Sequence, residues 1–126
     1  MQVVPSPPAD PGAFSFAVAG SDPSRVSLTA TGELDLAAVG DLAALLALHE
    51  AAGRTFIRLD LSAVTFMDCS CLGVLVGVHH HLDQRKGQLI LTDVSAPVAR
   101  LLAVTGLSAE LLVTTEPESP WVGASA

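Results

Sequence analysis

Ser70 stands where an apolar, strand-like segment gives way to an amphipathic run. Asp68 comes two residues before this serine, and Leu72-Gly73-Val74-Leu75 opens the run after it. A hydroxyl at the start of a helix can cap unpaired backbone N–H groups, and a phosphate there would meet those donors and the positive end of the helix dipole. Ser70 is therefore chemically suited to act as a reversible charge switch.

Two cysteines, Cys69 and Cys71, flank this serine. Cysteines separated by one residue would need a very tight ring to form a disulfide, and two sulfurs alone make a poor zinc site. Because a thiol at a helix N-terminus can have a lowered pKa, one hypothesis is a redox-responsive pair. The alternative is that both are small residues that pack at the turn.

Histidines suggest metal binding, since His79, His80 and His81 are consecutive. Neighbouring helical residues point about 100° apart, so these three rings cannot converge on one ion. We expect them to form a partly exposed end of a helix, with one ring against the sheet. His49 has no obvious partner in the sequence, and we assign neither a metal nor a cofactor.

Catalytic motifs are absent from the sequence. It contains no Gly-x-Ser-x-Gly, no phosphate-binding Gly-x-x-x-x-Gly-Lys-Ser/Thr and no dinucleotide fingerprint. A phospho-aspartate receiver would need an acidic cluster after its first strand and a lysine late in the sheet, but Lys86 precedes the fourth predicted strand. We therefore expect a protein that is not an enzyme.

Composition favours a single compact domain. Of the 126 residues, 50% are hydrophobic and 15% are charged, which excludes a disordered chain. The net charge of −7 would repel a nucleic-acid phosphate backbone. No apolar stretch approaches about 18 residues, and residues 1–8 lack the features of a signal peptide. We expect a cytoplasmic protein that binds neither nucleic acid nor membrane directly.

The N-terminal half predicts a hairpin followed by a helix. Apolar and polar residues alternate over Phe14–Val18 and Arg25–Glu33, which should pair as antiparallel strands. Apolar residues then recur at helical spacing over Leu36–Ala52, with Asp35 as the cap and Gly53 as the left-handed residue after the helix.

From residue 55 onward, strands and helices alternate. Strands are predicted over Thr55–Leu61, Gln88–Asp93 and Leu111–Thr114. Helices are predicted over Ser70 to about Arg85, and from a Ser95 cap to Gly106. This order implies parallel strands joined by right-handed crossovers. The expected fold is an α/β domain, with a mixed sheet of about five strands and three to four helices.

Two further expectations concern the helix after Ser70 and the ends of the chain. Gly73 and Gly77, four residues apart, would let that helix lie close to a neighbour. Its inward face should carry Leu72, Leu75, Val76 and Leu82. Proline-rich residues 1–13 and residues 116–126 are expected to be flexible tails around a domain over 14–115.

Three segments together are characteristic. They are Gly32-Glu33-Leu34-Asp35, the run from Leu59 to Asp68, and Ser70 with Leu72-Gly73-Val74-Leu75. Over roughly Phe14 to Thr115 the chain resembles the STAS domain of bacterial anti-sigma factor antagonists. The resemblance implies that the unmodified protein binds an anti-sigma factor, often itself a serine kinase, and thereby releases a sigma factor. Phosphorylation would reverse the binding, and a serine phosphatase would restore it.

By motif position, the resemblance implies that Ser70 is the phosphorylation site and that Asp35, Asp68 and Ser70 bind the partner. The chain departs from the family pattern at Cys69, commonly serine or threonine, and at Cys71, commonly glycine. These departures leave open a constitutively binding variant or one that senses oxidation. An alternative function is a STAS scaffold, or a module that binds a small ligand or nucleotide, in a signalling assembly.

Overall fold

The computed structural model describes residues 13–107 and 111–114, which form a five-stranded sheet in the order β1-β2-β3-β4-β5. β1 and β2 pair antiparallel, and each later strand is parallel to its neighbour. The predicted mixed sheet is therefore confirmed. The strands are β1 (Phe14–Ser21), β2 (Arg25–Leu34), β3 (Phe56–Met67), β4 (Gln88–Thr92) and β5 (Leu112–Thr114).

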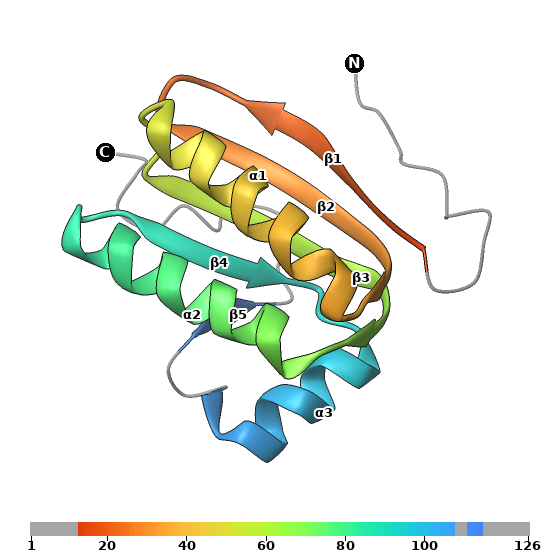
Figure 1. Cartoon of the computed structure of the whole chain (residues 1–126). Coiled ribbons are helices and arrows are strands. Elements are labelled where there is room, and N and C mark those ends of the chain that lie inside the picture. The colour runs from red at the N-terminus through yellow and green to blue at the C-terminus, as the bar shows by residue number, and fades with distance from the viewer. Residues whose placement is uncertain (1–12, 108–110, 115–126) are drawn as a thin grey trace.

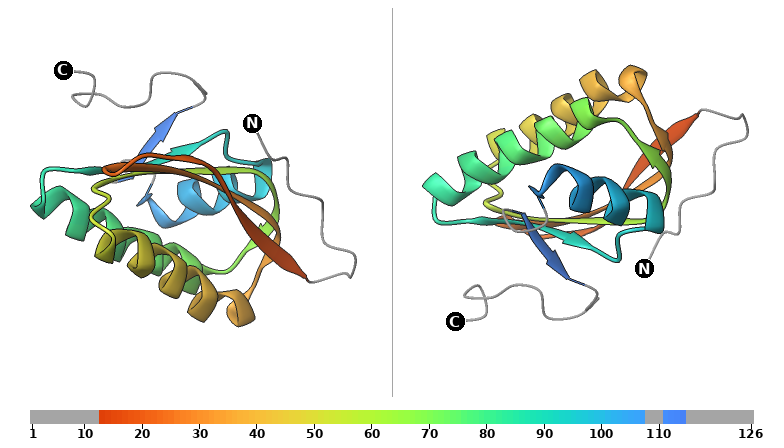
Figure 2. Two further views of the ribbon diagram at one scale, coloured as in Figure 1. Left: turned by 90° about the horizontal axis from the view of Figure 1, so that it is seen from above. Right: turned by 90° about the horizontal axis from the view of Figure 1, so that it is seen from below.

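Three α-helices within the described residues lie on one side of this sheet (Figures 1 and 2). They are α1 (Val39–Ala51), α2 (Cys69–Gln84) and α3 (Ala96–Thr105). One apolar core joins them to the strands, because Leu42 of α1, Leu75 of α2 and Leu102 of α3 belong to the same buried cluster. The opposite side of the sheet carries none of these helices.

Alternation along the strands decides which side chains enter the core. In β3, Ile57, Leu59 and Leu61 are buried in the cluster, and they alternate with partly exposed residues such as Arg58. Since successive strand residues point to opposite faces, Arg58 faces the side without helices. The parallel neighbours of β3 bury Leu28 and Leu89 in the same way.

β3 is longer than the sequence predicted, and its predicted end at Leu61 was wrong. Beyond Leu61 the strict alternation stops, because the next buried apolar residues are Val64 and Met67, three positions apart. Pairing with β2 nevertheless continues to Met67, with two register shifts on the way. Because of these irregularities, the second half of β3 does not show the alternation of apolar and polar residues by which strands are predicted.

The predicted helix ends are mostly confirmed. The first helical segment opens with a short 3-10 helix (Leu36–Ala38) capped by Asp35, and α1 follows. Gly53 and Gly106 both have left-handed backbone conformations after their helices. Ser95 occupies the cap position of α3, although its side chain makes no capping hydrogen bond.

The expectation for Gly73 and Gly77 was wrong, because a Cβ atom at either position would meet nothing within 4 Å. Leu72, Leu75 and Leu82 form the buried side of α2 as predicted, so these glycines lie away from it. The close approach is instead at Gly87, where a Cβ atom would lie 1.9 Å from the carbonyl oxygen of Thr55.

Among residues 13–107 and 111–114, no helix combines the length and apolarity that crossing a membrane requires. The predicted tails at 1–13 and 116–126 lie outside the described residues, except for Ala13.

Candidate functional site

Ser70 lies in the first turn of α2, with its side chain held by the residue that caps the helix. Asp68 has an extended backbone, and its carboxylate accepts a hydrogen bond from the backbone N–H of Ser70 at 2.8 Å. The Ser70 hydroxyl donates to the same carboxylate oxygen. Ser70 is half-buried, and its hydroxyl is held toward the Asp68 carboxylate.

This arrangement corrects the expectation that Ser70 itself caps the helix. The cap is Asp68, and Ser70 is the second residue of α2. The Asp68 carboxylate accepts the N–H of Ser70, so the Ser70 hydroxyl is not the capping acceptor and acts as a donor instead. The two bonds from Ser70, first that of its hydroxyl and then that of its N–H, lower the pKa of Asp68 below its ordinary value. Asp68 is therefore an anion at neutral pH.

Asp35 directly follows the end of β2 and lies at the same end of the sheet as Asp68. Its carboxylate accepts a hydrogen bond from the backbone N–H of Ala37 at 3.0 Å and caps the 3-10 helix. The backbone N–H of Asp68 donates to the carbonyl of Leu34 at 2.8 Å. The loops that carry Asp35 and Asp68 are thus joined directly, and the structure brings the three predicted site residues to one edge.

Cys71 forms a second connection between the two loops. Its thiol is fully buried and lies 3.4 Å from the carbonyl oxygen of Leu34 and 3.6 Å from that of Asp35. Burial raises the pKa of Cys71, and the negative charges of Asp68 and Asp35 raise it further. Both cysteines are free thiols, but only Cys69 is exposed. Cys71 therefore packs as a neutral side chain beneath the site.

Exposed apolar side chains flank this end of the sheet, and they were not predicted from the sequence. Leu36, directly after Asp35, is 72% exposed, and Phe66, two residues before Asp68, is 46% exposed. A groove of about 280 Å³ opens beside Phe66; its lining is Phe66, Met67, Pro97, Arg100, Leu101 and Val104. No pattern in the sequence marks Leu36 and Phe66 as exposed, because exposure depends on what packs over each side chain. Such a surface suits docking of a protein better than binding of a small polar molecule.

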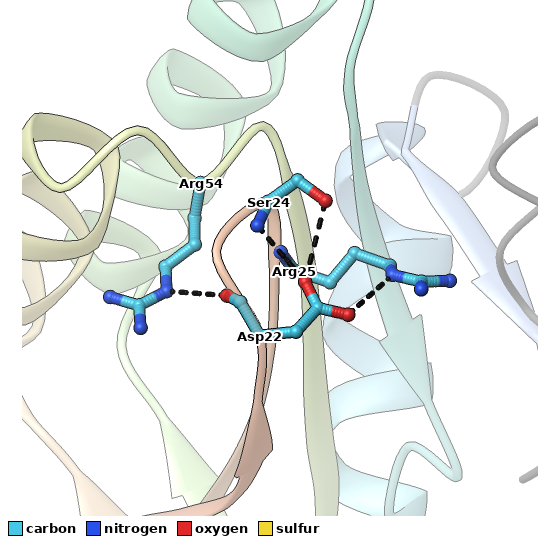
Figure 3. Close-up of polar contacts among 4 residues, drawn as sticks. All are labelled: Asp22, Ser24, Arg25 and Arg54. Atoms are coloured by element: carbon cyan, nitrogen blue, oxygen red, sulfur yellow. Dashed lines mark hydrogen bonds and ion pairs between the residues drawn. The ribbon is translucent and has the colours of Figure 1, made fainter.

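The same Asp-x-Ser spacing recurs in the turn between β1 and β2. The backbone N–H and hydroxyl of Ser24 both donate to Asp22 Oδ1, at 2.9 and 3.3 Å. Figure 3 shows Arg25 bound to the same carboxylate and Arg54 bound to the carbonyl of Asp22. This turn lies at the start of β2, whereas Asp35 follows its end. The local bonds of Ser70 therefore also occur at Ser24, but Ser24 lies in a turn between strands and Ser70 lies in a helix.

The histidines do not gather into one site. His80 and His81 are exposed and His79 is partly buried, while His49 is buried with its Nδ1 3.4 Å from Arg54. Burial, and then the charge of Arg54, lower the pKa of His49, which favours its neutral form. No group of three or more His, Cys, Asp or Glu side chains suited to a metal ion occurs among the described residues.

Comparison with known proteins gives a consistent result. The family model for the STAS domain matches residues 17–119. The anti-sigma-B factor antagonist of Listeria monocytogenes is 31% identical over 95 residues, which cover 75% of this chain and 83% of the relative. The protein of the same name from Staphylococcus aureus (strain COL) is 36% identical over 76 residues, which cover 60% and 70%.

Solved structures agree with this assignment. The anti-sigma factor antagonist SpoIIAA in its unphosphorylated form has a TM-score of 0.72 and 27% identity, over 82% of this chain and 91% of that one. SpoIIAA of Bacillus in its phosphorylated form gives 0.65 and 26%, over 82% and 95%. An anti-sigma factor antagonist from Mycobacterium paratuberculosis shares the fold, with a TM-score of 0.76 at 20% identity over 86% and 92%. The predicted family is confirmed, and the chain belongs to the STAS-domain family of anti-sigma factor antagonists.

Proposed function

We propose that the unphosphorylated form of this protein binds an anti-sigma factor and thereby releases a sigma factor, and that phosphorylation of Ser70 abolishes the binding. In this proposal the anti-sigma factor is a serine kinase, a serine phosphatase reverses the modification, and the protein acts in the cytoplasm without catalysing a reaction itself. The observation that carries the proposal is the position of Ser70: this half-buried residue lies in the first turn of α2, and its hydroxyl donates to the carboxylate of the cap residue Asp68.

Phosphorylation would change this contact directly. A phosphoserine oxygen has lost its proton, so it could no longer donate to Asp68. About −1.5 to −2 charge units would instead arrive beside that carboxylate. The positive end of the α2 dipole would offset part of the repulsion. The backbone N–H groups of Ser70, Cys71 and Leu72 already donate to Asp68. We therefore expect the fold to survive while the docking surface changes its charge.

The size of the effect is sufficient for a switch. A thousandfold loss of affinity corresponds to about 4 kcal/mol. One phosphate placed in a desolvated interface can account for that amount. Leu36 and Phe66 would supply the apolar contacts that bring the partner close to Ser70, and Asp35 would contribute from the neighbouring loop.

The test uses the purified chain as bait in extracts of its own organism, followed by mass spectrometry and affinity measurement with the purified partner. Wild type and Ser70→Ala should bind the anti-sigma factor, and Ser70→Asp should bind it much more weakly. Incubation with the kinase and ATP should phosphorylate wild type at Ser70 and leave Ser70→Ala unmodified. Asp35→Asn and Asp68→Asn, which keep the side-chain shape, should each weaken binding if these carboxylates contact the partner.

Ser24 provides the matched control, because it makes the same two bonds to an aspartate at the other end of β2. Ser24→Asp should leave both partner affinity and Ser70 phosphorylation unchanged. If Ser70→Asp binds the partner as tightly as wild type, the proposal is wrong. Saturable nucleotide binding by the purified domain, together with that result, would favour the alternative of a ligand-binding module.

A further inference from the structure

A polar cavity of about 320 Å³ lies on the side of the sheet that Figure 2 shows without helices. Leu28 of β2 and Leu59 of β3 belong to the core beneath the helices. Because successive strand residues point to opposite faces, their neighbours in these strands point to the side without helices. These neighbours supply much of the cavity, and β1 and β4 complete it. The polar residues of the lining are Ser27, Thr29, Arg58, Asp60, Thr92 and Asp93.

Strand register arranges these polar residues in two rows across the cavity. In the first row, Ser27 of β2 lies next to Arg58 of β3. In the second row, Thr29 lies next to Asp60, which in turn lies next to Thr92 of β4. Arg58 and Asp60 are two positions apart on the same strand face, which is about 7 Å. The sheet therefore holds a cation and an anion side by side, with a hydroxyl group next to each.

The charged groups of the cavity do not pair with one another. In the part of the chain that the structure describes, the Arg58 guanidinium makes no hydrogen bond or ion pair. The same holds there for the carboxylate of Asp93, which directly follows β4. The carboxylate of Asp60 accepts a hydrogen bond from the backbone N–H of Ser62 at 2.8 Å. Arg58, Asp60 and Asp93 are all partly exposed, so a molecule that enters the cavity can reach them.

The charges of the lining discriminate between classes of ligand. A lone anion would be attracted by Arg58 but repelled by Asp60 and Asp93, and a lone metal cation would be repelled by Arg58. Nucleotide bases commonly stack on aromatic rings, and none of the described lining residues is aromatic. A molecule that carries both a carboxylate and an ammonium group matches the whole set. Guanidinium binds a carboxylate through two parallel hydrogen bonds, and carboxylates accept hydrogen bonds from ammonium.

The volume of the cavity limits the size of this ligand, because ligand sites usually measure roughly 300–1,000 Å³ and this one lies at the lower end. We propose that the cavity binds a free α-amino acid, with its carboxylate on Arg58 and its ammonium group between Asp60 and Asp93. The neighbouring hydroxyl groups suit a small polar side chain. The inference does not rest on the proposed phosphorylation, since Ser70 belongs to α2 on the other side of the sheet.

Two-dimensional NMR of the full chain, titrated in turn with each standard amino acid, tests the proposal. At least one amino acid should cause saturable shifts of the amide signals of residues 27–29, 58–60 and 92–93. The analogue of that amino acid without its ammonium group, and the analogue without its carboxylate, should each bind about tenfold more weakly or worse, because each loses a charged hydrogen-bonding group. Absence of saturable shifts with every amino acid would overturn the proposal, and so would equal affinity for either analogue.

Two variants then locate the bound amino acid. Arg58→Gln and Asp93→Asn each remove one charge and keep a similar shape, so each should weaken binding about tenfold or more. The matched control is Arg100→Gln, which removes an exposed arginine of α3 outside the cavity and should leave the affinity unchanged. Circular dichroism shows whether each variant folds, and the two analogues decide the question on the wild-type chain if one does not. Unchanged affinity in either folded variant would refute the assignment of the site.

Discussion

Glycine in a helix interior lowers stability relative to alanine, and Gly73 occupies such a position in α2. The structure leaves room for a side chain there, since a Cβ atom would meet nothing within 4 Å. We therefore predict that Gly73→Ala raises the free energy of unfolding by about 1 kcal/mol, the intrinsic difference between the two residues in a helix. The added methyl group should make no steric clash that would reduce this increase in stability.

Gly87 offers the matched control, because there the same substitution meets the backbone. A Cβ atom would lie 1.9 Å from the carbonyl oxygen of Thr55, which accepts a 2.9 Å hydrogen bond from the N–H of Gln88. To relieve this clash, the start of β4 would have to move away from Thr55, which directly precedes β3. We expect Gly87→Ala to lower the free energy of unfolding by about 1–3 kcal/mol or more, as overpacking does.

Thermal unfolding followed by circular dichroism measures both effects. For a domain of this size, 1 kcal/mol corresponds to a shift in Tm of roughly 4 °C. Gly73→Ala should therefore melt about 4 °C higher than wild type by the same relation, and Gly87→Ala clearly lower. A lower Tm for Gly73→Ala would refute the reasoning, because it would mean that α2 packs closely against something at that position.

Three other outcomes follow from burial and hydrogen bonding. Leu75→Asp places a charge in the fully buried face of α2 and should cost about 3–5 kcal/mol, seen as loss of the cooperative melt. The pKa of Asp68 is lower in the folded protein than in the unfolded chain. The ionised carboxylate therefore stabilises the fold fully at pH values above its unfolded pKa, and this stabilisation is lost as the pH falls through its folded pKa. NMR titration should show that pKa rising in Ser70→Ala, with the backbone bond still holding it below its ordinary value. In the native protein a thiol reagent should modify Cys69 rapidly, and Cys71 only after unfolding.

The layout of the fold could be predicted because the relevant signals are local. Alternation of Val26 and Leu28 with polar residues identified β2, and the left-handed glycines at 53 and 106 marked two helix ends. The end of β3 could not be predicted in this way. Its last six residues pair with β2 in an irregular register. Such pairing does not require a regular alternation of apolar and polar residues, so the sequence gives no sign of it.

The nearness of Asp35, Asp68 and Ser70 in space was predicted, but their hydrogen bonds were not. Sequence placed Asp35, Asp68 and Ser70 together through a family resemblance, yet it assigned the helix cap to the hydroxyl. Which oxygen caps depends on where the helix begins, and that differed by one residue from the prediction. The apolar neighbours Leu36 and Phe66 were missed because exposure of a large apolar side chain is decided by what packs over it.

Local geometry alone does not select Ser70, because the same backbone contact occurs in three Asp-x-Ser segments. The serine N–H donates to the aspartate at 2.9 Å for Ser24, 2.8 Å for Ser62 and 2.8 Å for Ser70. Ser24 lies in a hairpin turn and Ser62 on a strand, whereas Ser70 lies in the first turn of a sixteen-residue helix. Of these three serines, only Ser70 would place a phosphate at the positive end of a helix dipole and beside an adjacent carboxylate. If a kinase modified Ser24 or Ser62 as readily as Ser70, this account of the selectivity would fail.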